Sequence, residues 1–314
     1  MQVYYGAKEL PKLNNAVITI GTFDGVHTGH AQIINQLKTE AALINGETVI
    51  ITFDPHPRMV VQADKNSDTL SLLNTLEEKI ELISNHGVDH LVVVAFTTEF
   101  SEQSADAYIR SFLVNNFHPK VIIIGYDHHF GKARAGNYKM LEQYAGEFNY
   151  RVKEIPEHVL NDITISSTKI RNALLSGDIE TANEFLGYDY SFEGTVVHGD
   201  KLGRTLGFPT ANIEISDDNK LIPANGVYAV EVALNPSGTV LKGMMNIGRR
   251  PTVGGVKQMI EVHIFDTNED LYDTTLCIFM KKYLRQEIKF NGLDQLKDQL
   301  QIDKQHTLSY FRKY

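Results

Sequence analysis

Two histidines and three glycines stand close together near the amino terminus, in the segment Gly21-Thr22-Phe23-Asp24-Gly25-Val26-His27-Thr28-Gly29-His30. His27 and His30 are three residues apart, so they point to one side if a helix begins there. The first turn of a helix offers unpaired backbone amides and the positive end of the helix dipole. This combination suits the phosphates of a nucleoside triphosphate and would stabilise negative charge that develops at phosphorus. The residues expected to contact the nucleotide are Gly21, Thr22, Phe23, Asp24, Gly25 and Gly29.

Two other interpretations of this segment compete with a phosphate site. A glycine-rich turn with two surface histidines would carry no chemistry. A zinc site made of His27, His30 and Asp24 is the second alternative, although the oxygen ligand of the trio is better suited to magnesium. The complete string of residues, placed between a strand and a helix, favours the phosphate site.

A second polar segment, Gly199–Asn212, combines a flexible loop with positive charge. Thr210 and Asn212 are two residues apart, which places both on the same face of a strand. A hydroxyl and an amide oxygen, together with ATP phosphates, can hold magnesium. The segment lacks the Gly-Lys-Ser/Thr of a Walker A loop, and its plain alternative is a barrel loop with a solvated edge. The glycines and basic residues expected to clamp phosphate are Gly199, Lys201, Gly203, Arg204 and Gly207.

Glu261 lies in a segment with the alternation of a strand. A carboxylate can accept the proton of a hydroxyl that attacks an electrophile. A lone glutamate on such a strand more often faces solvent, so its residue type alone does not establish a catalytic role. Further along the chain, Arg285 can pair with Glu287 on the surface.

Strand-like and helix-like stretches alternate up to about residue 185. The strand-like runs are Ala16–Ile20, Thr48–Phe53, Leu91–Phe96, Val121–Gly125 and Tyr150–Ile155. Helical spacing lies between them, at His30–Leu43, Leu76–His86, Ser104–Asn115 and Lys139–Glu147. This order predicts a Rossmann-like parallel sheet with helices on both faces, whose ligands bind beyond the carboxyl ends of the strands. Two more helices, Ser167–Leu175 and a second one to Leu186, precede Gly187.

The pattern changes after about residue 190, where strands follow one another without long helices. They are Phe192–His198, Ala211–Ile215, Val227–Leu234, Leu241–Ile247, Gln258–Phe265 and Thr274–Lys281. Six such strands separated by turn signals predict a small closed β-barrel, followed by helical stretches at Leu293–Gln301 and Lys304–Arg312. We therefore expect two domains, 1–187 and 188–314.

Composition limits the class of protein. The chain has 314 residues, enough for about two domains. Its 30 basic and 39 acidic residues give a net charge of −9, which argues against a general nucleic-acid binder. The single cysteine, Cys277, excludes an internal disulfide and a multi-cysteine metal site. No secretory signal and no apolar run near the length of a membrane span is present, so we expect a cytoplasmic protein without a membrane partner.

The motifs resemble those of the nucleotidyltransferases with an HxGH signature, and in particular those of the bacterial bifunctional riboflavin kinase/FMN adenylyltransferases (FAD synthetases). The resemblance covers almost the whole chain. Besides the two segments above, the similar segments are 53–57, 125–132, 165–171 and 246–252. Thr22 stands where many relatives carry Asn, and Lys169 replaces the more usual Arg, but both keep polar or basic character.

The resemblance implies two ATP-dependent reactions. The carboxy-terminal domain would phosphorylate riboflavin to FMN with Mg²⁺, and the amino-terminal domain would adenylylate FMN to FAD with release of pyrophosphate. For the kinase it implies Glu261 as the catalytic carboxylate, Thr210 and Asn212 as magnesium ligands, and contacts from Asn246 to nucleotide and from Arg285 to flavin. For the adenylyltransferase it implies catalysis by His27, His30 and Arg171, phosphate contacts from Ser166, Ser167 and Thr168, and flavin contacts from Asp127 and Phe130.

Several alternatives stay open at this point. The hydroxyls of Ser166, Ser167 and Thr168 can equally cap a helix, and His128 and His129 are possible flavin neighbours. One alternative is a chain in which only one of the two activities is live. Another HxGH transferase, such as a cytidylyltransferase, would not explain Gly199–Asn212. A flavin-binding regulator without turnover would be expected to lack His30, Asn212 or Glu261. Periodicity does not give the oligomeric state.

Overall fold

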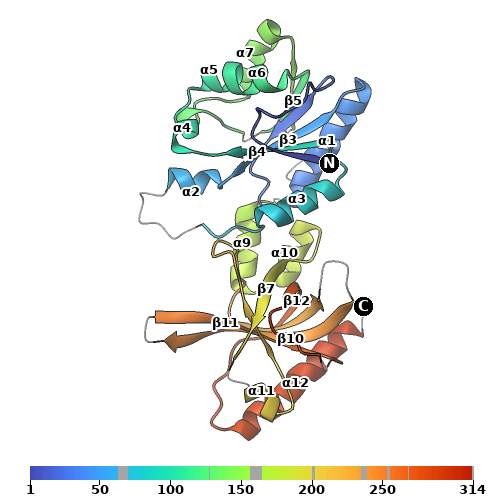
Figure 1. Ribbon diagram of the computed structural model, residues 1–314, viewed down its shortest axis with the longest axis vertical. Helices are drawn as coiled ribbons and strands as arrows, with labels where there is room; N and C mark the ends of the chain where they lie inside the picture. Colours follow the sequence, from blue (N-terminus) through green and yellow to red (C-terminus); the bar gives the residue numbers. More distant parts are fainter. Residues whose placement is uncertain are drawn as a thin grey trace. The chain divides into compact units, whose positions relative to one another are not determined.

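The computed structural model of the chain describes residues 1–62, 70–126, 128–155, 165–199, 202–234, 239–252, 255–267 and 269–312. Lys201 and Asp127, two of the predicted site residues, lie outside these ranges. The chain divides into two compact units, Met1–Ser167 and Thr168–Tyr314 (Figure 1). Among the residues in these ranges, no helix has the length and apolar character that crossing a membrane requires.

The first unit is built on a six-stranded sheet in the order β1-β4-β3-β2-β5-β6. Every pairing in it is parallel, which confirms the predicted parallel sheet. Its strands are β1 (Gln2–Tyr5), β2 (Val17–Ile20), β3 (Thr48–Asp54), β4 (His90–Ala95), β5 (Val121–Gly125) and β6 (Arg151–Ile155). The edge strand β1 was not predicted, because its four residues offer no buried β-branched run.

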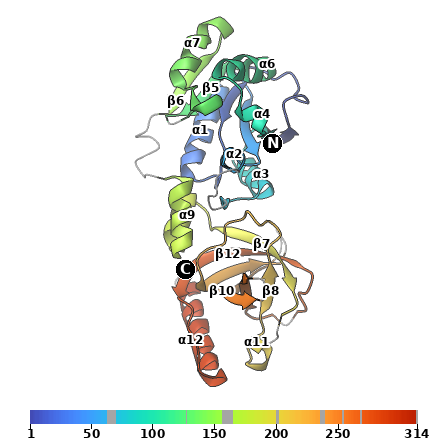
Figure 2. The same cartoon turned by 90° about the vertical axis from the view of Figure 1, so that its left-hand side faces the viewer.

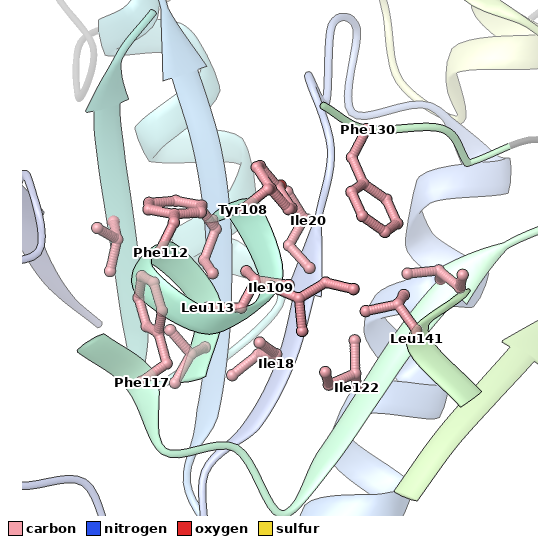
Figure 3. Close-up of a cluster of buried hydrophobic side chains, with 14 of the residues drawn as sticks. Ile18, Ile20, Tyr108, Ile109, Phe112, Leu113, Phe117, Ile122, Phe130 and Leu141 are labelled. Carbon is pink, nitrogen blue, oxygen red and sulfur yellow. The ribbon is translucent and has the colours of Figure 1, made fainter. Parts of the chain in front are cut away.

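Successive residues of the central strands serve two cores, one on each face of the sheet. Ile18 and Ile20 of β2 pack on one face, and Val17 packs on the other, as the pleat of a strand requires. The first core is covered by η1 (Tyr108–Val114) and α7 (Tyr138–Phe148), and Figure 3 shows its aromatic and aliphatic side chains meeting above β2. The second core is covered by α1 (Thr28–Leu43) and α3 (Leu76–Asn85).

The predicted helix Ser104–Asn115 is three consecutive pieces. A short turn, α5 (Ala105–Ala107), leads into η1, which is a π-helix, and α6 (Asn115–Phe117) follows. Tyr108, Ile109, Phe112 and Leu113 are buried in this stretch, a spacing that fits either helical period. The remaining short helices of this unit are α2 (Pro57–Val61), α4 (Thr98–Ser101) and η2 (Lys132–Arg134).

The second unit is a closed barrel of antiparallel strands in the order β10-β11-β8-β7-β12-β9, which confirms the predicted six-stranded barrel (Figure 2). Its strands are β7 (Ser191–Val197), β8 (Ala211–Glu214), β9 (Gly226–Ala233), β10 (Val240–Thr252), β11 (Gly255–Ile264) and β12 (Thr275–Arg285). The two predicted carboxy-terminal helices are one continuous helix, α12 (Leu293–Phe311). No Gly or Pro lies between Gln301 and Lys304 to end the first predicted helix. Asp303, which lies between the two predicted helices, is buried.

Helices α9 (Ser167–Ser176) and α10 (Ile179–Leu186) connect directly to the barrel. Asn183 donates to the Met280 carbonyl oxygen at 2.8 Å and accepts from the Tyr190 amide at 2.8 Å. Gly187 ends α10 in the left-handed conformation, as its glycine predicts. Contacts thus group residues 168–187 with the barrel, whereas the domain boundary after residue 187 stays a prediction.

Candidate active sites

The first candidate site lies where β2 passes into α1. The rings of His27 and His30 stack with their centroids 3.8 Å apart and an interplanar angle of 18°, and Phe23 lies against His30 at 4.9 Å. His27 is the N-cap of α1 but its side chain makes no capping bond. Both histidines therefore point to one side at the start of the helix, as their spacing predicts. Gly29 makes this possible, because a side chain there would meet the His27 ring at 3.2 Å.

Both histidines are neutral near pH 7. Burial lowers the pKa of His27 to about 4. Burial, followed by repulsion from His27 and Lys79, holds the pKa of His30 well below its usual value. Among the described residues, neither buried Nδ1 atom has a hydrogen-bond partner. Buried polar atoms are normally paired, so these two nitrogens are available to a polar ligand as neutral hydrogen-bonding groups.

The loop between β2 and α1 is held in an uncommon conformation. Phe23 and Val26 have positive φ angles of 47° and 34°, which a β-branched or bulky residue rarely adopts. Buried Asp24 accepts from the Leu73 amide at 2.9 Å through Oδ1, and its carbonyl oxygen accepts from Ser167 Oγ at 2.8 Å. Such strain is concentrated at functional sites and needs surrounding contacts to persist. Asp24 and Ser167 thus fix the loop, a structural task that the sequence did not reveal.

The trio Asp24, His27 and His30 does not form a metal centre. The described part of the chain contains no group of three or more His, Cys, Asp or Glu side chains arranged to hold a metal ion. The zinc interpretation therefore has no support in the geometry.

Lys79 is a candidate residue that the sequence reasoning missed. It lies on α3, is only 6% exposed, and has a pKa that burial lowers while Asp24 and Asp54 raise it. Asp54 ends β3, at the carboxyl edge of the sheet. The signal was present in the sequence, because Lys79 stands in the apolar i, i+3, i+4, i+7 series of α3 that also contains Leu76 and Ile83.

The other predicted residues of the first site have mixed surroundings. Phe130 is 5% exposed and stacks on Tyr108 with 4.9 Å between centroids, so it packs in the core beside η1 (Figure 3). Gly136 faces its ring so closely that a side chain there would overlap it. The Thr22 carbonyl oxygen accepts from Thr52 Oγ1 at 3.1 Å. Thr168 and Arg171 lie in α9, whose first residue is Ser167, and Ser166 directly precedes that helix.

The second candidate site is a row of three side chains across adjacent strands. Asn212 on β8 is the register partner of Glu261 on β11, and Glu261 is in turn the partner of Asn246 on β10. Side chains directly opposite one another share a face of the sheet. Ile260 and Val262, which flank Glu261, are buried, and successive side chains of a strand point to opposite faces, so the row lies on the face away from these core residues.

A cavity of about 450 Å³ borders this row and is lined by Gly199, Asn212, Lys220 and Glu261 among others. Among the described residues, the buried Asn212 Oδ1 atom has no hydrogen-bond partner. A side chain at Gly199 would overlap the Asn212 amide, which explains the glycine. An oxygen that is buried, unpaired and beside a carboxylate fits a hard cation such as Mg²⁺, so these residues suit the predicted metal.

The described part of the loop predicted to bind phosphate, residues 202–208, is partly helical. It contains a short helix, α11 (Leu202–Thr205), with Arg204 exposed. The Phe208 amide donates to the Gly203 carbonyl oxygen at 2.8 Å, and Gly207 adopts a left-handed φ of 83°. The loop leads to Thr210, one residue before β8, whereas Asn212 lies within that strand, so the shared face of Thr210 and Asn212 stays a prediction.

Two cations of this unit have roles that the sequence did not give. Lys220, 5% exposed, lines the cavity, and its Nζ lies 4.8 Å from the centroid of the Tyr190 ring. Arg285 binds Asp303 rather than Glu287, through Nε at 2.8 Å and Nη2 at 2.6 Å. The alternative pairing of Arg285 with Glu287 is therefore wrong; Glu287 instead accepts from Asn246 Nδ2 at 3.4 Å.

Comparison with known proteins agrees with the two-unit structure. Residues 9–169 match the family described as FAD synthetase, and residues 186–311 match the family described as riboflavin kinase. A solved structure described as a macrolide-efflux protein from Streptococcus pneumoniae is 29% identical, with a TM-score of 0.87 and 98% of each chain covered.

Three curated relatives are named bifunctional riboflavin kinase/FMN adenylyltransferase. The protein from Listeria monocytogenes is 40% identical, and the match covers 95% of this chain and 93% of the relative. The protein from Haemophilus influenzae is 38% identical over 95% of each chain. The protein from Escherichia coli K12 is 36% identical over 94% of this chain and 92% of the relative. With the histidine pair of the first unit and the Asn212–Glu261 row of the second in place, the chain belongs to the family of bifunctional riboflavin kinase/FMN adenylyltransferases.

Proposed function

We propose that this chain converts riboflavin to FAD in two ATP-dependent steps, one in each unit. The observation that carries the proposal is the register pairing of Asn212 with Glu261 beside a cavity, in a chain that also holds the stacked pair His27 and His30. A transferase limited to one activity would need only one of these arrangements.

The kinase step is assigned to the barrel unit. Glu261 accepts the proton of the ribityl 5′-hydroxyl while that oxygen forms a bond to the γ-phosphorus of ATP and the bond to ADP breaks. Thr210 and Asn212 would hold Mg²⁺, which neutralises phosphate charge when it is bound. Gly199, Gly203, Arg204 and Gly207 are our candidates for the phosphate contacts, and Lys201 stays a candidate from the sequence. Asn246 lies beside Glu261 to position the nucleotide. Lys220 adds positive charge at the cavity wall.

The adenylyl transfer is assigned to the sheet unit. A phosphate oxygen of FMN attacks the α-phosphorus of ATP, and pyrophosphate leaves with the electrons of the broken bond. The attacking phosphate is already an anion, so the step needs no general base and depends on positioning and charge stabilisation. His27 and His30 supply neutral hydrogen-bonding groups, whereas Lys79 is our candidate for the positive charge within this unit. Arg171, Thr168, Ser166 and Asp127 stay candidates from the sequence.

The proposed small-molecule partners are riboflavin, FMN and ATP, with Mg²⁺ in the kinase step. Phe130 packs in a core and Arg285 is held by Asp303, so support for their flavin contacts rests on the resemblance alone. A cytoplasmic location and the absence of nucleic-acid and membrane partners likewise rest on the sequence.

A chromatographic assay of the purified chain with riboflavin, ATP and Mg²⁺ tests the proposal. FMN should appear first and FAD later. If FMN forms but no FAD appears, even after FMN is added directly, the first unit has no adenylyltransferase activity. If FAD forms from added FMN but riboflavin yields no product, the second unit has no kinase activity. Saturable flavin binding without any product would establish the regulator instead.

The variant His30→Ala provides the matched test of the first site. It should stop formation of FAD from FMN while leaving formation of FMN from riboflavin unchanged. Unchanged FAD formation would remove His30 from catalysis.

A further inference from the structure

His263 stands on β11 two residues after Glu261, so both side chains lie on the same face of the strand. It is 7% exposed, and its Nδ1 atom lies 2.7 Å from the carbonyl oxygen of Pro209. A carbonyl oxygen can only accept a hydrogen bond, so Nδ1 carries the proton and donates to Pro209.

Two aromatic side chains hold the ring in this orientation. Phe208 and Phe265 meet the imidazole edge to face, each with 5.4 Å between centroids, at angles of 69° and 66°. Phe208 and Phe265 belong to one apolar cluster with Met244, which is the register partner of His263 on β10. Aromatic side chains therefore contact the ring while its Nδ1 donor faces Pro209.

The bonded carbonyl belongs to the peptide group that joins Pro209 to Thr210. Pro209 has no amide hydrogen of its own, and both Pro209 and Thr210 are exposed. Before Pro209, the loop is held by the hydrogen bond that the Phe208 amide donates to the Gly203 carbonyl oxygen at 2.8 Å. His263 thus fixes the last peptide before the predicted metal-binding hydroxyl, at a place where the backbone could otherwise turn toward water.

We propose that His263 is a positioning residue of the kinase site, which sets the Thr210 hydroxyl relative to Asn212 and Glu261 through the Pro209 carbonyl. The proposal rests on the proposed kinase function. The strand that carries the proton acceptor therefore also orients the loop that carries a metal ligand. Residues that orient a metal ligand through a hydrogen bond typically contribute 10- to 100-fold to metal affinity or activity, and His263 would act in this way through the backbone that carries the ligand.

Two substitutions in the full chain separate this role from packing. His263→Leu removes the donor and keeps an apolar side chain between Phe208 and Phe265. His263→Asn places an amide NH₂ near the position of Nδ1 and can restore the bond to Pro209. The readouts are the dissociation constant of ADP with Mg²⁺ by calorimetry, its value without the metal, and the Mg²⁺ concentration that half-saturates FMN formation.

The leucine variant should weaken Mg²⁺-dependent ADP binding and raise the half-saturating Mg²⁺ concentration by about tenfold. Binding of ADP without metal should not change, and the asparagine variant should recover most of the loss. Formation of FAD from added FMN should stay at the wild-type level, because it uses the other unit.

Two results would overturn the proposal: a loss of stability or kcat with unchanged metal dependence in His263→Leu, or equal losses in both variants. If His263→Leu does not fold, His263→Gln, whose amide reaches too far to replace Nδ1, takes its place with the same expectations. If the wild-type chain forms no FMN, the kinase function fails, while the calorimetric comparison still decides the role of His263.

Discussion

Arg285 and Asp303 are joined at two points, from Nε to Oδ1 at 2.8 Å and from Nη2 to Oδ2 at 2.6 Å. Asp303 is 1% exposed and also accepts from Gln299 Nε2 at 2.9 Å. This pair ties the end of β12 to the middle of α12, so the long carboxy-terminal helix is fastened to the barrel by a buried carboxylate.

The substitution Arg285→Ala leaves that carboxylate buried without its cation. We expect a loss of about 3–5 kcal/mol in the free energy of unfolding of the barrel unit, the cost typical of breaking a buried ion pair. Chemical denaturation of the full chain, followed by a probe in each unit, measures it. The control is Glu180→Ala, which removes the exposed pair with Lys282 and should cost less than about 1 kcal/mol. Similar small losses in both variants would contradict the structural role of Arg285.

The substitution Glu261→Gln keeps the size of the side chain and removes its capacity to accept a proton. FMN formation should fall by about 10²- to 10⁴-fold, the usual contribution of a general base, while FAD formation from added FMN should continue. Glu214→Gln, at another residue that lines the same cavity, is the control and should keep most of the kinase activity. A parallel fall of both activities in Glu261→Gln would refute the assignment of two separate sites.

The pKa of His27 makes the stability of the first unit depend on pH. Its pKa is about 4 in the folded chain against 6.5 for an unperturbed histidine, so the unfolded state binds more protons between these values. The contribution of His27 to the free energy of unfolding is fully present above pH 6.5 and is lost as the pH falls toward 4. The total loss is about 3 kcal/mol. His27→Gln should remove that part of the pH dependence. Melting temperatures of both proteins between pH 4.5 and 7.5 provide the measurement, and parallel curves would exclude the effect.

Lys79→Met retains the apolar stem of the lysine and removes the charge near Asp24 and Asp54. We expect FAD formation from FMN to fall by about 10²-fold or more, as for other losses of a preorganised charge, with FMN formation unchanged. Lys38→Met is the matched control, since Lys38 is exposed on α1 and donates to the His86 carbonyl oxygen at 2.7 Å. If the two variants have the same FAD activity, Lys79 has no part in the reaction.

A fragment of residues 168–314 should be more stable than one of residues 188–314. The shorter fragment lacks α10, whose Ile179, Ala182 and Leu186 are buried and which contributes the Asn183 bonds to Met280 and Tyr190. Burial of a large apolar side chain contributes about 1.5–3 kcal/mol, and the shorter fragment loses this contribution, so we expect a difference of several kcal/mol. Urea unfolding of both fragments tests this, and equal midpoints would support a domain boundary after residue 187.

The sequence was sufficient to predict the strands and helices whose residues follow a regular hydrophobic pattern. Alternating β-branched runs predicted the central strands β2 to β5 and all six barrel strands, because a pleated or doubly covered strand leaves that pattern in its residues. The edge strand β1 is too short and polar to leave it. Residue types and spacing also predicted that His27 and His30 point to one side, whereas the shared face of Thr210 and Asn212 stays a prediction.

Contacts between distant parts of the chain could not be predicted in this way. Arg285 binds Asp303, 18 residues away in the sequence, and His263 donates to Pro209, 54 residues away. No feature of the neighbouring sequence distinguishes these partners from other residues of the same type. Phe130 similarly resembles a ligand contact in the sequence, but the approach of Tyr108 places it in a core. Such choices depend on which surfaces the fold brings together.

The orientation of β11 has a consequence for how this protein can vary. Ile260, Val262 and Ile264 are buried on one face of the strand, whereas Glu261 lines the cavity and His263 is buried against Phe208 and Phe265 on the other face. Substitutions at residues 260, 262 and 264 should therefore alter stability, those at Glu261 turnover, and those at His263 both properties. A saturation scan of residues 260–264 should yield two interleaved profiles, because the barrel interior tolerates exchange among apolar residues whereas Glu261 does not tolerate replacement.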